Sequence, residues 1–368
     1  MKNFLLLAFL FLSLNLIGQP IRIVDPVYGG PIITEQMMRA INETSADNWG
    51  IRETELEKYR GTLTGAGYKI CVVDTGAPAH KDLTVTKAAN FSTDPSGLDS
   101  NGHSTHIGGI IKQVAPKAEV YYAKSLNNKG SGDLSQVTRG VNWCTDYSVD
   151  VISLSLGGRS TNAAFKQSID RANAAGILVY AAAGNDGQHR DGKTNYIGYP
   201  GIYSNTLTVG SSNISGNVSS FSSGGPYGTL IAPGENIMST WLNNCYRQLS
   251  GTSMATPFAA GVAVLMKQGG RSYQEIFDET KNYTIDWGAP GYSYDSFYGI
   301  ISPQKCFDIG NGTEPPKQEP IDPDTPKTLN DLWIKLVGLL ILGAGLVLTF
   351  LKIRGIKSEP SGGPDSDG

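Results

Sequence analysis

Between residues 68 and 266, short apolar runs alternate with amphipathic stretches, and this alternation limits the folds open to the chain. The apolar runs are continuous rather than polar at every second residue, which is typical of strands buried on both faces. They lie at residues 68–74, 119–125, 149–156, 177–183 and 206–210. Helical periodicity is found at residues 103–113, 134–146, 163–175 and 253–266. We therefore expect an α/β fold, with a mostly parallel sheet that has helices on both faces.

The size and charge of the chain favour a globular protein with a large core and argue against some functions. With 368 residues and 40% hydrophobic content, the chain can bury a large core. Its formal net charge is −3 and no run of lysine and arginine stands out, so the composition argues against a nucleic-acid partner. The 45 glycines are scattered along the chain, which indicates tight turns and close backbone contacts rather than low complexity.

The first 18 residues have the pattern of a secretory signal peptide. Lys2 precedes an apolar stretch that ends at Ile17, and Gly18 supplies a small residue at the expected cleavage point. An uncleaved membrane anchor is the alternative interpretation of the same pattern. Residues 19–61 follow as an N-terminal segment, which we expect to consist of loops with one helical stretch at residues 51–59.

The other end of the chain has the pattern of a membrane anchor. Residues 310–331 are rich in proline and acids, which predicts an extended stalk. Residues 332–351 form an apolar stretch long enough to cross a lipid bilayer as a helix. Basic residues follow at once, so the positive-inside rule puts residues 352–368 in the cytosol and the rest of the exported chain outside. A buried core helix at residues 332–351 is the alternative.

Four cysteines occur in a chain that we expect to be exported, so disulfides are possible. Cys71 lies in an apolar run, where we expect a buried free thiol. A bond between Cys245 and Cys306 is left open, and Cys144 has no assigned partner. The sequence has no C-x-x-C motif and only four histidines, so we expect no structural zinc site.

Three short motifs carry the residue types of a nucleophilic catalytic site. Asp74 ends an apolar run, at the carboxyl end of a strand, where open parallel sheets bind ligands. His103 opens the motif HSTHIGG, and Ser253 lies in the motif GTSMATP. A hydroxyl becomes a good nucleophile when a base takes its proton and a third group orients the base. Taken singly, each residue has a commoner explanation as a turn residue or a helix cap; together and in this order, they indicate a catalytic triad.

Asn185 and His106 are two further candidate site residues. Asn185 follows the run Ala-Ala-Ala-Gly at the end of a predicted strand, and its amide is a donor of the kind that stabilises an oxyanion. A turn-forming asparagine is the alternative. His103 and His106 have the spacing of a metal-binding pair on one helix face, but no carboxylate has the right spacing, so we expect no metal there.

Together, the motifs resemble those of the subtilisin-like serine proteases (subtilases, peptidase family S8), over roughly residues 68–307. The resemblance implies a subtilisin-like peptidase domain at residues 62–309. In that family pattern Asp74 orients His103, His103 is the base and Ser253 is the nucleophile. Asn185 helps to hold the oxyanion, and His106 is a packed structural residue.

Two glycine-containing runs match the edges between which this family clamps an extended peptide. They are Gly130-Ser131-Gly132 and Ser155-Leu156-Gly157. Glycine leaves backbone N–H and C=O groups accessible, so that a peptide can add to such an edge as a strand. Ordinary loops are the alternative. The resemblance also covers residues 198–201, 221–223 and 231–234, loops that frame the specificity pocket in the family.

The chain departs from the family pattern at several points. Ser104 stands where glycine is usual, and Phe258 stands where histidine is frequent. Residues 110–116 are short where many relatives carry a calcium-binding loop, and Asp82 alone matches a calcium-ligand position. We expect that no cofactor is required, with calcium left open. The residues before Tyr68 are too few for a full inhibitory propeptide, so the control of activity is also open.

The sequence therefore favours a serine endopeptidase that cleaves protein or peptide substrates at the outer face of a membrane, where residues 332–351 would contact lipid. A catalytically silent surface-binding protein on the same fold is the alternative, but a binding protein needs none of the four polar side chains. An esterase with the same triad is a third possibility, which the peptide-clamping edges argue against.

Overall fold

The computed structural model describes residues 21–24, 26–42, 49–59, 61–187, 194–279, 284–285 and 297–307. The chain divides into two units between Pro315 and Pro316, and all the described residues belong to the first. The predicted signal peptide (1–18), stalk (310–331), membrane helix (332–351) and tail (352–368) lie outside the described residues. Within the described ranges, no helix has the length and apolar character needed to cross a bilayer.

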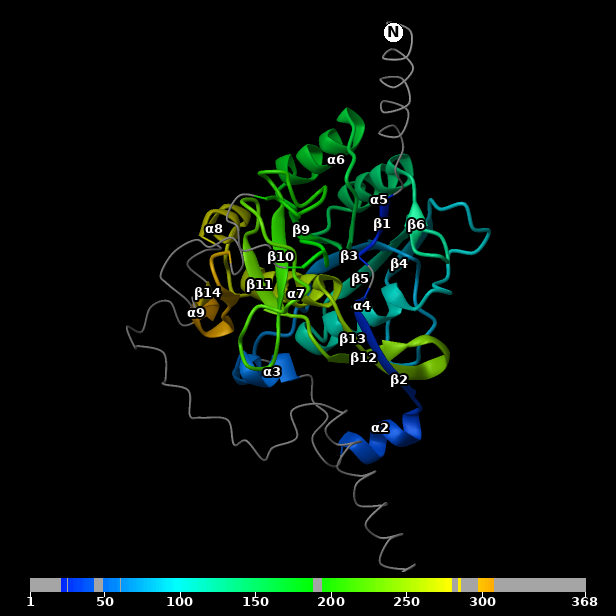
Figure 1. Cartoon of the computed structure of the whole chain (residues 1–368), viewed down its shortest axis with the longest axis vertical. Helices are drawn as coiled ribbons and strands as arrows, with labels where there is room; N and C mark the ends of the chain where they lie inside the picture. Colours follow the sequence, from blue (N-terminus) through cyan, green and yellow to red (C-terminus); the bar gives the residue numbers. More distant parts are fainter. Residues whose placement is uncertain are drawn as a thin grey trace, which may run out of the picture. The chain divides into compact units, whose positions relative to one another are not determined.

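The helices and strands are distributed along the whole of the described chain (Figure 1). The helices are α2 (Glu35–Asn42), α3 (Trp49–Glu53), η1 (Leu56–Lys58), α4 (His103–Val114), α5 (Leu134–Asp146), α6 (Ala163–Ala174), η2 (Leu242–Asn244), α7 (Thr252–Gln268), α8 (Tyr273–Glu279) and α9 (Pro303–Phe307). The strands are β1 (Ile21–Ile23), β2 (Tyr28–Ile33), β3 (Lys69–Asp74), β4 (Lys87–Asn90), β5 (Glu119–Lys124), β6 (Ser131–Gly132), β7 (Val151–Leu154), β8 (Leu156–Gly157), β9 (Leu178–Ala182), β10 (Leu207–Ser212), β11 (Leu230–Pro233), β12 (Ile237–Trp241), β13 (Cys245–Ser250), β14 (Thr284–Ile285) and β15 (Ile300–Ile301).

The largest sheet confirms the expected mostly parallel α/β architecture. Its nine described strands have the order β14-β15-β11-β10-β9-β7-β3-β5-β4. Every neighbouring pair is parallel except β14 with β15. The five strands predicted from apolar runs correspond to β3, β5, β7, β9 and β10, with ends shifted by a few residues. The last residues of the predicted run 149–156 belong instead to the separate strand β8.

Alternation along β3 shows how the sheet builds two cores. Ile70 and Val72 face a cluster that contains residues of α4 and α7, while Cys71 and Val73 face a cluster with residues of α5 and α6. Successive side chains of a strand point to opposite faces, so one continuous apolar run serves both layers. Figure 1 shows α5 and α6 above the strands and α4 below them.

The two helices of the first layer approach closely. A Cβ atom on Gly261 of α7 would lie 2.7 Å from Cγ1 of Val114 in α4, so a larger residue would push the helices apart. The first turns of the same two helices begin at His103 and at Thr252. These two first turns contain His103 and Ser253.

Two small antiparallel sheets complete the fold, with the strand orders β6-β1-β8 and β12-β13-β2. Both include a strand from the N-terminal segment, which the sequence analysis expected to be loops with one helix at residues 51–59. That helix is also interrupted, as α3 and the short η1. β1 and β2 pair only with strands far along the chain, so the sequence analysis, which relied on local patterns, did not predict them.

The cysteines correct the sequence-based expectation. Cys71 is not a free thiol: it forms a disulfide with Cys144, with an S–S distance of 2.04 Å and a Cα–Cα distance of 5.9 Å. Cys71 points from β3 toward the inner face of α5, where Cys144 lies. The bond left open between Cys245 and Cys306 is absent, and both are free thiols.

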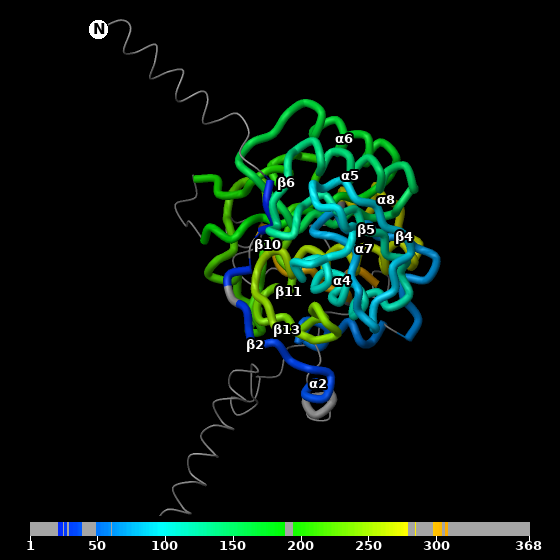
Figure 2. Tube along the Cα trace, turned by 90° about the vertical axis from the view of Figure 1, so that its right-hand side faces the viewer, coloured from blue at the N-terminus to red at the C-terminus, as the bar shows by residue number. Residues whose placement is uncertain are grey.

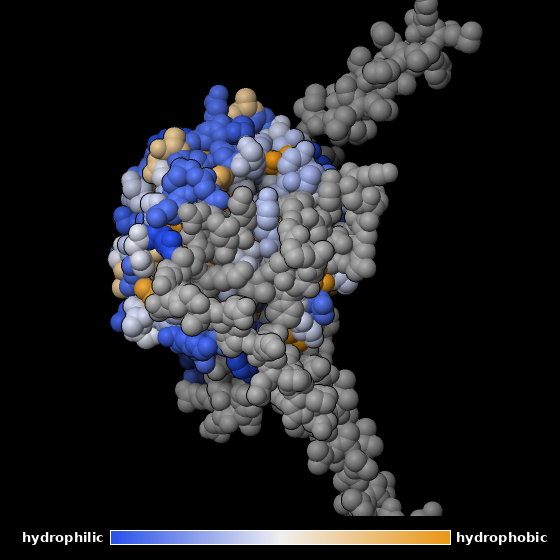
Figure 3. All heavy atoms as spheres, turned by 90° about the vertical axis from the view of Figure 1, so that its left-hand side faces the viewer, coloured by the Kyte–Doolittle hydropathy of each residue, from blue (hydrophilic) through white to orange (hydrophobic). Residues whose placement is uncertain are grey.

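The described surface gives little sign of a broad apolar patch. On the face seen in Figure 3, the described residues are mostly hydrophilic, and the hydrophobic ones are scattered singly. Exposed large hydrophobic residues in the described ranges include Ile32, Leu98 and Tyr227. Scattered apolar residues of this kind are ordinary on a globular protein surface.

Candidate active site

The predicted residues Asp74, Asn185, His103 and Ser253 are placed by the carboxyl edge of the parallel sheet and by helix N-termini. Asp74 is the last residue of β3, and Asn185 follows three residues after β9. His103 and Ser253 lie in the first turns of α4 and α7. Ligands bind at this edge in open parallel sheets, because strand ends and helix N-termini converge there.

Asp74 and His103 form a buried pair. The His103 Nδ1 atom lies 2.8 Å from Oδ1 and 3.0 Å from Oδ2 of Asp74. Both side chains are almost completely buried. The Thr75 N–H donates to Asp74 Oδ1 at 2.7 Å, which fixes the carboxylate in turn. A carboxylate facing Nδ1 favours the imidazole tautomer with its proton on that nitrogen, so that Nε2 can accept a proton.

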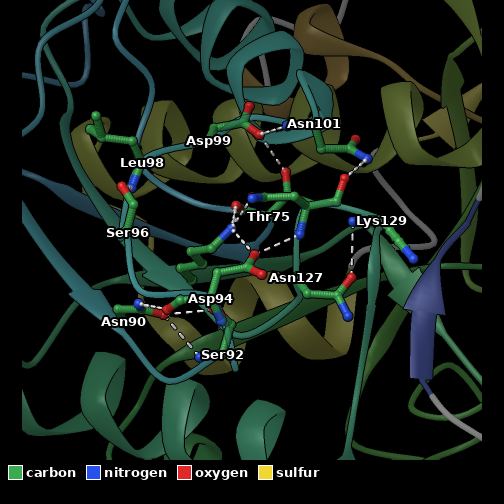
Figure 4. Close-up of polar contacts among 12 residues, drawn as sticks. Thr75, Asn90, Ser92, Asp94, Ser96, Leu98, Asp99, Asn101, Asn127 and Lys129 are labelled. Carbon is green, nitrogen blue, oxygen red and sulfur yellow. Dashed lines mark hydrogen bonds and ion pairs between the residues drawn. The ribbon is translucent and has the colours of Figure 1, made fainter.

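A polar network around Asp99 lies between the residue after Asp74 and the start of α4, and Figure 4 shows its bonds to Thr75 and Asn101. The Thr75 hydroxyl donates to Asp99 Oδ1 at 2.9 Å and accepts from the Ser104 N–H at 3.1 Å. Asp99 also accepts from the N–H groups of Gly102 and Thr105, at 2.9 and 2.8 Å. Asp99 therefore supplies acceptors for the first N–H groups of α4, as an N-cap residue does. The network holds the backbone after Asp74 against the backbone beside His103.

A buried lysine stabilises the same region. Lys124 is the partner of Asp74 in the register of β3 with β5, and its side chain is completely buried. Its ammonium donates to the Thr75 carbonyl at 2.5 Å and to Asn128 Oδ1 at 3.0 Å. It also forms an ion pair with Asp94 at 3.3 Å. A buried ammonium needs several acceptors, and here they come from three segments next to Asp74.

Ser253 lies between the N-terminal segment at Val24 and the end of the edge at Ser155. Its hydroxyl donates to the Val24 carbonyl at 2.7 Å and lies 3.2 Å from the Ser155 carbonyl. Asn185 Oδ1 accepts from both the N–H and the hydroxyl of Thr252, each at 3.0 Å, which fixes the orientation of the amide. A Cβ atom on Gly251 would lie 3.1 Å from Asn185 Nδ2, so glycine at this position leaves room for the amide.

The two predicted peptide-clamping edges flank an extended strand, and that strand is the chain's own β1. Ile21 pairs with Gly132 and Arg22 with Ser131 on one side. On the other side, Arg22 pairs with Gly157 and Ile23 with Leu156. The segment continues to Val24, which brings its carbonyl to Ser253. The sequence analysis missed this segment, although the alternation of Ile21 and Ile23 around Arg22 is a weak strand signal.

The ends of both edges also contact the segment through hydrogen bonds. The Ile23 N–H donates to the Gly130 carbonyl at 2.9 Å, and the Val24 N–H donates to the Ser155 carbonyl at 3.2 Å. All six residues predicted for these edges are therefore placed along the extended segment. A second peptide cannot occupy the same edges until β1 leaves them.

A cavity of about 610 Å³ opens beside Val24. Its lining includes Gly157, Gly184 and Gly198, and the last of these belongs to a loop that the resemblance assigned to the specificity pocket. Arg159 and Asp186, which form an ion pair with each other, also line it. Glycine walls leave room for a large side chain, whereas the ion pair leaves no net charge at this part of the cavity.

His106 has a structural role, as expected. It is completely buried, and its Nε2 atom lies 2.9 Å from the Arg247 carbonyl. Burial lowers the pKa of His106 from 6.5 to about 3. The imidazole is therefore neutral over the whole physiological range.

The described residues include no group of three or more His, Cys, Asp or Glu side chains arranged to hold a metal ion. Asp82, the one residue that matched a calcium-ligand position, accepts a hydrogen bond from the Tyr246 hydroxyl. It also lies 3.5 Å from the Lys81 ammonium. These neighbours supply a donor and a positive charge, and neither is a calcium ligand.

Comparison with known proteins identifies the family. The model of the subtilase family matches residues 65–284. The chain belongs to this family. It is therefore an enzyme of the subtilisin-like serine endopeptidase class, and its fold is the subtilisin-like α/β fold.

Several curated relatives match over most of the described domain. M-protease of Shouchella clausii (strain KSM-K16) is 39% identical over 262 residues, which cover 68% of this chain and 67% of the relative. Subtilisin DY of Bacillus licheniformis is 43% identical over 254 residues, covering 65% of this chain and 90% of the relative. Minor extracellular protease Epr of Bacillus subtilis (strain 168) is 34% identical over 268 residues, which cover 69% of this chain and 41% of the relative.

Proposed function

We propose that this subtilase hydrolyses peptide bonds through Asp74, His103 and Ser253. Ser253 Oγ attacks the carbonyl carbon of a peptide bound where Val24 lies, and His103 Nε2 takes the hydroxyl proton. Asp74 keeps the imidazole in the required tautomer and stabilises its positive charge. His103 then returns the proton to the leaving amine, and water releases the acyl group from Ser253 by the reverse path.

The oxyanion that forms during attack needs donors. We assign this role to the Ser253 N–H, at the start of α7, and to the Asn185 amide, whose oxygen is engaged by Thr252. Preorganised donors of this kind act in the transition state, when negative charge develops on the carbonyl oxygen.

One observation supports the proposal most strongly. An extended peptide segment lies between the two edges, and its carbonyl oxygen is 2.7 Å from Ser253 Oγ. A silent binding protein has no need to place a serine hydroxyl at the carbonyl of the bound peptide. An esterase has no need of two strand-pairing edges.

The test is hydrolysis of unfolded casein by the full chain and by the variants His103→Ala and His106→Gln. We expect His103→Ala to lose at least about 10³-fold in kcat, because removal of a triad member leaves only binding and oxyanion stabilisation. His106→Gln should stay within about tenfold of the unmodified chain. Equal activity of the unmodified chain and His103→Ala would remove His103 from the mechanism.

We further propose that the protein is exported and anchored by one membrane helix, with the peptidase domain outside and the C-terminus in the cytosol. The support is the sequence pattern of residues 1–18, 332–351 and 352–368. Protease shaving of intact cells should release an active soluble domain by cleavage in residues 310–331. A C-terminal tag that antibody reaches without permeabilisation would contradict this orientation.

A further inference from the structure

The substrate cleft continues beyond Ser253 along β13. This strand runs from Cys245 to Ser250 and leads directly into Gly251 and the catalytic serine. The segment that follows Val24 in the sequence lies on this strand as β2, antiparallel to it (Figures 1 and 2). The Val27 N–H donates to the Ser250 carbonyl at 2.9 Å. Residues 21–24 and 26–33 therefore lie along the cleft on both sides of Ser253.

Pairing between β2 and β13 covers most of both strands. Ser250 pairs with Tyr28 and Leu249 with Gly29, and after a bulge Arg247 pairs with Ile32. The other edge of β13 is paired with β12. If β2 leaves, β13 becomes an edge strand whose backbone groups are ready to pair with another extended peptide.

Arg247 adds a side-chain contact to this backbone pairing. Its Nε–H donates to the Gly30 carbonyl at 3.1 Å. The guanidinium stacks on Trp241, with Cζ 4.9 Å from the ring centroid, which holds the arginine in place. An arginine held by an aromatic ring and bonded to a peptide carbonyl recognises backbone, so it does not require a particular substrate side chain at that residue.

The space above Arg247 does limit the size of the residues that pass it. A Cβ atom on Gly29 would lie 2.6 Å from Arg247 Nη2, and one on Gly30 would lie 3.2 Å from Gln248 Cβ. At the far end of the strand, Ile33 is buried, so a hydrophobic side chain has a site there. The strand therefore fits small residues at the positions of Gly29 and Gly30 without displacing the end of the Arg247 side chain, and an aliphatic residue at the position of Ile33, three residues after Gly30.

We infer that β13 and Arg247 form a binding subsite for the part of a substrate that lies C-terminal to the cleaved bond. The inference rests on the proposed function, with Val24 at the position of the residue that supplies the cleaved carbonyl. Gly29 and Gly30 then mark the fifth and sixth positions after it. The substrate class is an extended polypeptide with small residues at these two positions and a chain long enough to reach Arg247.

The test compares peptides that compete in one reaction with the full-length enzyme. All begin with the sequence of residues 21–24 followed by two alanines. The short peptide ends there, as an amide. The long peptide continues with the sequence of residues 27–34, and a third peptide has valine in place of both glycines. The long peptide and the valine peptide both need β1 and β2 displaced, so the ratio of their kcat/KM values is independent of how often the two strands leave the cleft.

We expect the long peptide to be cleaved about tenfold more efficiently than the short one, and the valine peptide to lose this advantage. In Arg247→Ala, the ratio of kcat/KM for the long peptide to kcat/KM for the short peptide should fall about tenfold, to about one. Arg139→Ala is the matched control, because Arg139 also donates to a main-chain carbonyl and lies over an aromatic ring, but on α5. It should leave the ratio unchanged.

Each other outcome has a definite meaning. Equal cleavage of the three peptides by the unmodified enzyme, or a ratio that Arg247→Ala does not change, would overturn the inference while leaving the endopeptidase proposal intact. Cleavage of none of the peptides, together with no hydrolysis of casein, would instead overturn the proposed function.

Discussion

At the scale of single residues, the geometry of the proposed triad depends on polar side chains outside it. Asp99 and Lys124 hold Thr75, whose N–H in turn holds the Asp74 carboxylate. The sequence analysis identified Asp74, His103, Ser253 and Asn185 because each lies in a distinctive motif. It did not identify Asp99 or Lys124, because their roles depend on contacts between segments that are far apart in sequence.

Asn185→Ala should lower kcat by about 10²–10³-fold with little change in KM, because the amide acts on the oxyanion and not on the bound substrate. Steady-state kinetics on a peptide substrate measures both parameters, and circular dichroism checks that the variant is folded. A kcat within about twofold of the unmodified enzyme would remove Asn185 from the oxyanion site.

His106 should make stability depend on pH. Burial, opposed in part by the hydrogen bond to the Arg247 carbonyl, lowers the pKa of His106 to about 3, whereas the ordinary value is 6.5. As pH falls between these values, the unfolded chain binds a proton that the folded chain does not. The free energy of unfolding therefore falls, by about 2 kcal/mol between pH 6.5 and about pH 5.

The measurement is thermal melting at about pH 7 and pH 5, in a Ser253→Ala background that prevents self-digestion. Between pH 7 and pH 5, the Tm of the chain with His106 should fall by about 4–8 °C more than the Tm of the His106→Gln variant. Equal losses in the two proteins would show that His106 does not titrate with a lowered pKa.

At the scale of helices and strands, the sequence predicted those elements whose pattern lies within one continuous stretch of the chain. The apolar runs of β3, β5, β7, β9 and β10 and the periodicity of α4 to α7 were sufficient to locate them. β1 and β2 were missed because three to six residues give too short a pattern, and because their partner strands are distant in the sequence. The disulfide was missed for the same reason, since it joins residues 73 positions apart.

The Cys71–Cys144 bond should contribute about 4 kcal/mol to stability, because it closes a loop of 73 residues in the unfolded chain. Replacing both cysteines by alanine should lower Tm by about 8–16 °C. Cys245→Ser is the control, because that free cysteine is only partly buried, and it should shift Tm by no more than about 2 °C. If the double variant had the same Tm as the unmodified protein, the disulfide would not be formed.

At the scale of the whole molecule, the described residues form one peptidase domain with its own N-terminal segment in the cleft. The sequence predicted the domain and its family. It left the control of activity open, because the residues before Tyr68 are too few for a full propeptide. A substrate must displace β1 before it can reach Ser253, so the first encounter of the enzyme with a substrate should be slow.

We propose that no metal ion is required for stability, and chelation should therefore have little effect. Lys124 supplies a buried positive charge to acceptors beside the active site, and Asp82 has a hydroxyl and an ammonium as neighbours. With excess EDTA, Tm should change by less than about 4 °C. A decrease of about 10 °C or more, reversed by added calcium, would show that the fold depends on a bound ion.

The most direct test of the central claim is covalent labelling with a fluorophosphonate, which reacts only with a serine that a neighbouring base has activated. Intact mass should show one label per full-length chain, and peptide mapping should locate it on Ser253. The Ser253→Ala chain, folded by circular dichroism, should take up none. Equal labelling of Ser253→Ala, or no labelling of the unmodified chain under conditions that fully label a subtilisin, would contradict the assignment of Ser253 as the nucleophile.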